Sequence, residues 1–242
     1  MSPAPKRGKG MEQMDFSYLD RNYKDIRSRM DAAEKAAGRT SPVTLIAAAK
    51  SGTAEEIDYL HHHCGLCDIG ENRVQQLLEH YEKIDRVGMN FHFIGHLQTN
   101  KVKYIIDKVT MIHSVDSEHL AAEIDRQAEK HGRIMKVLVE VNSGREENKS
   151  GVLPEDAASL CGAIGKYPHL KLSGLMTMAP VCENPEDFCN YFREISRIAV
   201  DIFGENMDNK KYMLSMGMSG SFEQAIACGA TAIRVGRKLF EK

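Results

Sequence analysis

The stretch LIAAAKSGTAEE, residues 45–56, contains the unit from which the whole chain is built. Its first half is an apolar run that ends at Lys50, as expected of a buried strand. Its second half starts a helix, because Thr53 and Glu56 have the spacing of a capping box. A strand followed at once by a helix is the repeating unit of proteins with a parallel sheet.

The same unit recurs along the chain. Strand-like apolar runs occur at residues 43–49, 66–70, 91–95, 111–115, 135–141, 171–178, 212–216 and 232–235. Amphipathic stretches follow most of them, the clearest at 118–131 and 187–203, and Ser221 with Gln224 repeats the capping-box spacing. Eight units in roughly 200 residues predict an α/β protein with one closed (β/α)8 TIM barrel. The alternative is an open doubly wound sheet, which is weakened because no Gly-rich dinucleotide loop follows the first strand.

The domain organisation follows from what lies outside these units. Helical spacing of apolar residues predicts an extra N-terminal helix over residues 17–37, and Gly38 is a typical helix stop. Residues 1–14 are rich in small and basic residues and lack the apolar stretch of a signal peptide, so they are expected to form a disordered lead. We therefore predict a single barrel domain over residues 15–242.

The composition excludes several classes of partner. The chain has 242 residues, with 32 Lys and Arg against 34 Asp and Glu, so no global charge points to nucleic acid or an anionic membrane. No apolar run is long enough to span a bilayer. The six cysteines are expected to be reduced thiols, as in a cytoplasmic protein.

Candidate functional residues lie where the strands end, because barrels of this kind carry their chemistry at the C-terminal ends of the strands. The first strand ends at Lys50. The seventh delivers SMGMSGSFEQAI, residues 215–226, in which small residues and hydroxyls directly precede a helix that suits a phosphate. The eighth delivers RVGR, residues 234–237, a second Gly-containing turn. The plainer alternatives are that Ser219 and Ser221 only cap a helix and that Lys50 only reaches solvent.

Taken together, a lysine, a phosphate cradle and Arg234 describe one ligand, the planar phosphorylated aldehyde pyridoxal 5′-phosphate (PLP). A desolvated lysine near another cation loses its proton more easily, and its free amine condenses with an aldehyde. Arg234 would face the pyridine nitrogen and donate a hydrogen bond without giving up its proton. Such a site would hold the cofactor while stabilising substrate carbanions only weakly.

Eight motifs resemble those of the PLP homeostasis proteins, the YggS/PROSC family, from about residue 16 to the C-terminus. They are AAAK ending at Lys50, GENRVQQ at 70–76, FHFIGHLQTNK at 91–101, HSVDS at 113–117, NKSG at 148–151, GLMTM at 174–178, LSMGMSGSFEQAI at 214–226 and IRVGRKLF at 233–240. The resemblance implies a barrel similar to the N-terminal domain of bacterial alanine racemase. It also implies a protein that binds PLP and delivers or buffers it, with no established catalytic turnover.

The resemblance further implies a role for each matching residue. Lys50 would carry PLP as a Schiff base, Asn72 would lie near the ring and its hydroxyl, and Arg234 would face the ring nitrogen. The phosphate side would comprise Ser215, Met216, Ser219 and the backbone N–H groups of Gly236 and Arg237. Two positions depart from the family pattern: Arg237 replaces a Ser or Thr, and His96 stands where Pro or Ser is common.

Three other interpretations remain open from the sequence. HHHCGLC, residues 61–67, has spacing that permits Cys64 and Cys67 to bind zinc with a histidine, although no second pair completes a four-ligand site. An amino-acid racemase would use Lys50 as one base, but the opposing tyrosine of alanine racemases comes from a second domain. An interaction protein would present Lys149 and residues 98–101 to a partner. A monomer is expected, with apo PLP-dependent enzymes as candidate partners.

Overall fold

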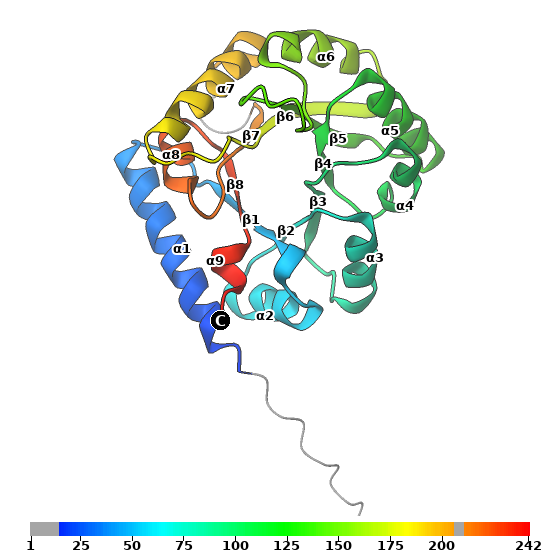
Figure 1. Cartoon of the computed structure of the whole chain (residues 1–242). Coiled ribbons are helices and arrows are strands. Elements are labelled where there is room, and N and C mark those ends of the chain that lie inside the picture. Colours follow the sequence, from blue (N-terminus) through cyan, green and yellow to red (C-terminus); the bar gives the residue numbers. More distant parts are fainter. Residues whose placement is uncertain (1–14, 206–210) are drawn as a thin grey trace, which may run out of the picture.

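Eight parallel strands close into a barrel at the centre of the molecule (Figure 1). The computed structural model describes residues 15–205 and 211–242, and the predicted disordered lead over residues 1–14 lies outside them. The strands follow the chain order around the barrel, and the last pairs with the first. They are β1 Thr44–Ala48, β2 Asp68–Glu71, β3 Asn90–Phe93, β4 Met111–Val115, β5 Met135–Val141, β6 Leu170–Thr177, β7 Met213–Ser215 and β8 Ala232–Val235. The predicted (β/α)8 barrel is confirmed, and the open doubly wound sheet is wrong.

Helices surround the barrel on its outer face (Figure 1). The α-helices are α1 Ser17–Ala36, α2 Ala54–Cys64, α3 Val74–Lys83, α4 Val102–Ile105, α5 Glu118–Lys130, α6 Ala157–Ile164, α7 Asp187–Phe203, α8 Phe222–Ala227 and α9 Arg237–Phe240. Short 3₁₀ turns lie at η1 Ala49–Ser51, η2 Thr99–Lys101 and η3 Pro154–Asp156. Each predicted strand has a counterpart among the observed strands, with ends that differ by at most two residues.

Helix α1 is the extra N-terminal helix that the spacing predicts, and it ends one residue earlier than expected. It buries Leu19, Ile26 and Met30 and packs against α8 and α9 at the end of the chain. The side-chain amide of Asn22 donates to the carbonyl oxygens of Leu239 at 3.2 Å and Glu241 at 2.7 Å. The first helix thus fastens the last segment of the chain beside β1.

The two predicted helix caps have different outcomes. At α2, Thr53 Oγ1 accepts the Glu56 N–H at 3.3 Å and Glu56 Oε2 accepts the Thr53 N–H at 2.8 Å, so the capping box is confirmed. At α8 the box is wrong. Ser221 precedes the helix, but its hydroxyl accepts the N–H of Met218 at 3.2 Å, and so it orders the loop after β7 instead.

The core has two parts. The larger one lies between the strands and the surrounding helices, where Phe93, Phe192 and Phe222 are among the largest fully buried side chains. A smaller cluster of Met111, Leu138 and Met176 is separate from it, with Met213 packed against its side. These four residues come from β4, β5, β6 and β7, and they form an apolar layer inside the barrel.

Within the described part of the chain, none of the helices has the length and apolar character that crossing a bilayer requires.

Gly174 provides a test of the barrel geometry. It lies in β6 opposite Met213 with φ +139°, and an added Cβ would overlap the Met213 carbonyl oxygen. Gly174→Ala is expected to lower the free energy of unfolding by more than ~3 kcal/mol, because backbone strain and a backbone clash add. Gly132→Ala is the matched control: Gly132 also has positive φ, +58°, but an added Cβ has nothing within 4 Å. Urea denaturation of both variants checks the prediction, and equal losses would contradict it.

Candidate functional site

A cavity of about 610 Å³ opens at the C-terminal ends of the barrel strands. Its walls come from the segments that follow β1, β2, β3, β6, β7 and β8. The volume lies in the range of small-molecule and cofactor sites. Of the predicted cofactor-binding residues, the cavity is lined by Lys50, Asn72, Ser219, Arg234, Gly236 and Arg237.

Lys50 stands at the rim of this cavity. Strand β1 ends at Ala48, the chain tightens into η1, and the Lys50 side chain is exposed while Ala49 before it is buried. The expectation of a desolvated lysine is therefore wrong for the free protein. Exposure instead leaves the ammonium group accessible to a molecule that enters the cavity from solvent.

Arg234 forms the deepest charged part of the cavity. It lies on β8 and is only 4% exposed. Its Nη1 donates to the Ser215 carbonyl oxygen at 2.6 Å and the Ser215 hydroxyl at 2.7 Å, and its Nη2 donates to the Thr177 carbonyl oxygen at 2.8 Å. Burial lowers the pKa of Arg234 to about 10, and the charge of Glu140 opposes this shift. The guanidinium is still protonated at neutral pH, and its Nε has no partner among the described residues.

Asn72 follows β2 and faces the same cavity. Its Oδ1 is buried and has no hydrogen-bond partner among the described residues. The backbone of Asn72 is held close to Gly95, where an added Cβ would overlap the Asn72 carbonyl oxygen. The backbone position of Asn72 is therefore constrained, and its side chain has a buried acceptor without a partner, which is costly unless a donor arrives.

The loops after β7 and β8 meet on one side of the cavity. The backbone N–H groups of Ser219, Gly220, Gly236 and Arg237 make no hydrogen bond within residues 15–205 and 211–242. The Ser219 hydroxyl accepts the Lys238 N–H at 3.5 Å and so links the two loops. Unpaired N–H groups at neighbouring loops form a concave surface that suits an anion.

Ser215 and Met216 are placed differently from the other predicted residues. Neither lines the cavity: both are fully buried, and the Met216 N–H already donates to the Ala232 carbonyl oxygen at 3.1 Å. The Ser215 hydroxyl lies between Arg234 and His113, at 2.7 Å and 3.0 Å. Their contact with a phosphate stays a prediction, while the structure gives Ser215 a role in holding Arg234.

Glu140 is a residue that the sequence analysis did not single out, because it lies within the apolar run at 135–141 that forms β5. It is 3% exposed, accepts the Ser150 hydroxyl at 3.2 Å through Oε1, and has no described partner for Oε2. It lines a smaller cavity of about 180 Å³ with Lys149, and this cavity shares the wall of residues 178–181 with the larger one. Burial raises the pKa of Glu140 to about 7, opposed by the hydrogen bond from Ser150.

The remaining sequence candidates lie outside the main cavity. His96 is exposed and pairs with Asp116, Nδ1 to Oδ2, at 3.6 Å. In residues 61–67, His61 contacts the carbonyl oxygens of Leu66 and Val87, at 3.0 and 2.9 Å. No group of three His, Cys, Asp or Glu in the described chain has the geometry of a metal site, so the structure does not support the zinc interpretation.

Comparison with known proteins places this geometry in a family. The family model described as "Alanine racemase, N-terminal domain" matches residues 14–241. The pyridoxal phosphate homeostasis protein of Aquifex aeolicus is 42% identical over 215 residues, which cover 89% of this chain and 94% of that protein. Its namesake in Escherichia coli K12 is 31% identical over 230 residues, covering 90% and 94%.

A solved structure gives the same result at the level of the fold. PipY of Synechococcus elongatus superimposes with a TM-score of 0.79 without PLP and 0.77 with PLP bound. The identities are 30% and 28%, and each match covers 92% of this chain and 99% of PipY. Nothing in these comparisons favours the racemase alternative.

The raised pKa of Glu140 makes the stability of the protein pH-dependent. The pKa of Glu140 in the folded state, about 7, exceeds its ordinary value of 4.5. The contribution of protonated Glu140 to the free energy of unfolding is therefore fully present below pH 4.5 and is lost as the pH rises through 7. Glu140→Gln should remove this loss, so the variant should gain ~2 kcal/mol relative to the wild type between pH 5 and pH 8. Urea titrations at both pH values measure this, with the exposed Glu147→Gln as control. A difference between variant and wild type that does not change with pH would contradict the prediction.

Proposed function

This chain belongs to the family of pyridoxal phosphate homeostasis proteins, and from that premise we propose that it binds PLP in the cavity at the mouth of its barrel. The proposal extends to its role: the protein holds PLP in reserve and releases it to apo PLP-dependent enzymes. The observation that carries the proposal is the convergence on one cavity of an accessible lysine, a buried arginine and a set of unpaired backbone donors.

The residues present fit the cofactor in three places. The unpartnered Asn72 Oδ1 needs a donor, which the ring hydroxyl of PLP supplies. The free Nε–H of Arg234 needs an acceptor, which the ring nitrogen supplies. The unpaired N–H groups of the loops after β7 and β8 suit the phosphate.

The chemistry that PLP supplies when bound is an aldehyde that condenses with a primary amine. Lys50 offers that amine at the cavity rim, on the turn that follows β1. Asn72 orients the ring through its side-chain amide, and Gly236 and Arg237 anchor the phosphate with their N–H groups. Ser219 sits beside them, where its hydroxyl links the two loops.

Arg234 decides what kind of PLP site this is. Its pKa of about 10 keeps it protonated at neutral pH, so it donates to the ring nitrogen and gives that nitrogen no proton. Enzymes that need a strong electron sink place a carboxylate at this position instead. The arrangement supports storage of the cofactor over carbanion chemistry.

The rim of the cavity supports exchange with another protein. Met178, Val181 and Met218 are exposed there, and Val181 is fully so. Exposed apolar side chains beside a ligand site are typical of protein contacts. We propose that an apo-enzyme docks on this rim.

The wider setting belongs to the same proposal. The protein would act as a monomer with one domain over residues 15–242, and the family match over residues 14–241 supports that boundary. It would reside in the cytoplasm, where thiols such as its six free cysteines stay reduced.

The proposal is tested by locating the bound cofactor. Wild-type protein loaded with PLP should show a visible absorbance band, and borohydride reduction followed by peptide mapping should place the adduct on Lys50. Lys50→Ala should abolish the band, because no other lysine lines the cavity in the described chain. Lys171→Ala, at the opposite end of the barrel, is the matched control and should keep it. An unchanged band in Lys50→Ala, or an adduct on another lysine, would overturn the assignment.

A further inference from the structure

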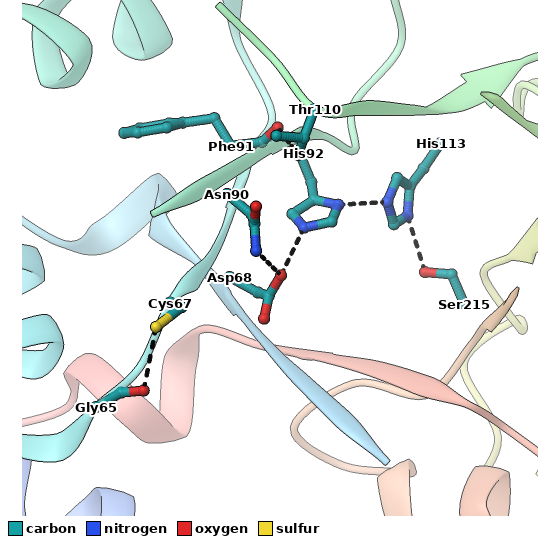
Figure 2. Close-up of polar contacts among 9 residues, drawn as sticks. All are labelled: Gly65, Cys67, Asp68, Asn90, Phe91, His92, Thr110, His113 and Ser215. Atoms are coloured by element: carbon teal, nitrogen blue, oxygen red, sulfur yellow. Dashed lines mark hydrogen bonds and ion pairs between the residues drawn. The ribbon is translucent and has the colours of Figure 1, made fainter. Parts of the chain in front are cut away.

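A continuous chain of hydrogen bonds runs from Arg234 through the interior of the barrel to its opposite end. Arg234 Nη1 donates to Ser215 Oγ at 2.7 Å. Figure 2 shows the rest of the chain: Ser215 Oγ to His113 Nδ1 at 3.0 Å, His113 Nε2 to His92 Nδ1 at 2.9 Å, and His92 Nε2 to Asp68 Oδ1 at 3.0 Å. The five residues lie on β8, β7, β4, β3 and β2, so only a closed barrel brings them together.

The residues of this hydrogen-bond chain are buried, except for Asp68 at the end opposite Arg234. Ser215 and His113 have no exposed surface, and His92 and Arg234 are 4% exposed. The Asp68 side chain is 25% exposed and also accepts the side-chain amide of Asn90 at 3.1 Å. The interiors of such barrels are usually filled by layers of branched apolar residues. A row of hydrogen-bonded polar side chains through this interior therefore points to a role beyond packing.

The donors and acceptors fix the direction of the chain. Arginine only donates, so Ser215 Oγ accepts from Arg234. The Ser215 O–H then points to His113 Nδ1, the His113 Nε2–H donates to His92 Nδ1, and the His92 Nε2–H donates to the Asp68 carboxylate. Both imidazoles are then neutral Nε2–H tautomers and every group is satisfied.

The reverse direction leaves groups without partners. If His113 carried its proton on Nδ1, Ser215 Oγ would accept two hydrogen bonds and its own O–H would lose its acceptor. His92 would then donate from Nδ1, and it would need a second proton on Nε2 to face the Asp68 carboxylate. Burial, together with the charge of Arg234, lowers the pKa of His113 well below its usual range, which agrees with a neutral ring.

We propose that Ser215, His113 and His92 are positioning residues for Arg234, anchored by Asp68, and that their fixed direction holds the guanidinium so that its free donor faces the ring nitrogen of the cofactor. This inference rests on the proposed function for the identity of the ligand. The direction of the hydrogen-bond chain stands without it. Ser215 acts directly, because its lone pair and its carbonyl oxygen both hold Nη1.

The first experiment needs no ligand. Long-range ¹H–¹⁵N NMR of the histidine rings in the free full-length protein should show His113 and His92 as neutral Nε2–H tautomers at pH 7. Asp68→Asn, an isosteric change at a partly exposed residue, should introduce the Nδ1–H form of His113, because the carboxylate no longer favours one direction. An Nδ1–H or doubly protonated His113 in the wild type would overturn the proposal. An unchanged tautomer pattern in Asp68→Asn would overturn the role of Asp68 as its anchor.

The second experiment measures binding of PLP against an analogue whose ring nitrogen is replaced by C–H. Ser215→Ala and His113→Phe should raise the Kd for PLP roughly tenfold, the value of one hydrogen bond to a charged group. They should leave the Kd for the analogue nearly unchanged, because it offers Arg234 no acceptor. A loss caused only by weaker folding would affect both ligands equally, and that result would overturn the proposal.

A matched control separates positioning from general damage to the barrel. Thr231→Val removes another buried hydrogen bond, the one that the Thr231 hydroxyl accepts from the Leu214 N–H at 2.8 Å, and it lies outside the cavity and the chain. It should leave both dissociation constants unchanged. If the wild type binds neither ligand, the proposed function fails, and the tautomer experiment still decides the direction of the chain.

Discussion

A guanidinium buried inside a barrel is the constraint on which the rest of this site depends. A cation there is stable only where acceptors surround it, and Arg234 finds them on the two strands that precede it, at Thr177 and Ser215. The charge of the buried acid Glu140 acts on Arg234. Because the pKa of Glu140 is about 7, this carboxyl offsets only part of the positive charge of Arg234 at neutral pH. Arg234 also lines the cavity, and its Nε is left without a hydrogen-bond partner among the described residues, so the site has a donor to offer to a ligand that accepts a hydrogen bond.

The two ends of the cavity are built by different means. At the Arg234 end, side chains from several strands fix one geometry, and each depends on its neighbours. At the end formed by the loops after β7 and β8, the donors are backbone N–H groups, and the Arg237 side chain is exposed. Backbone donors do not change when a side chain does, so the proposed phosphate contacts do not depend on which side chain stands at position 237.

The fold was predictable because parallel strands buried on both faces read as unbroken apolar runs, and all eight runs were visible. Most of the cavity was predictable for a related reason: polar residues that end such strands, like Lys50 and Asn72, must meet at one edge of the barrel. The interior was not predictable. His92 and His113 stand within strands, and their partners are set by the register between distant strands, which no local pattern encodes. For the same reason Ser215 faces the barrel interior rather than the cavity, and the exposure of Lys50 depends on the turn at η1.

The seam where β1 meets β8 determines when the wall of the cavity is complete. Lys50 and Gly236 lie on opposite sides of this seam. Helix α1 stabilises it, because the Asn22 side chain donates hydrogen bonds to the carbonyl oxygens of Leu239 and Glu241. The cavity therefore has no complete wall until β8 has paired with β1. A segment that lacked β8 would still carry Lys50, but it would lack the wall of the cavity that Arg234 and Gly236 form.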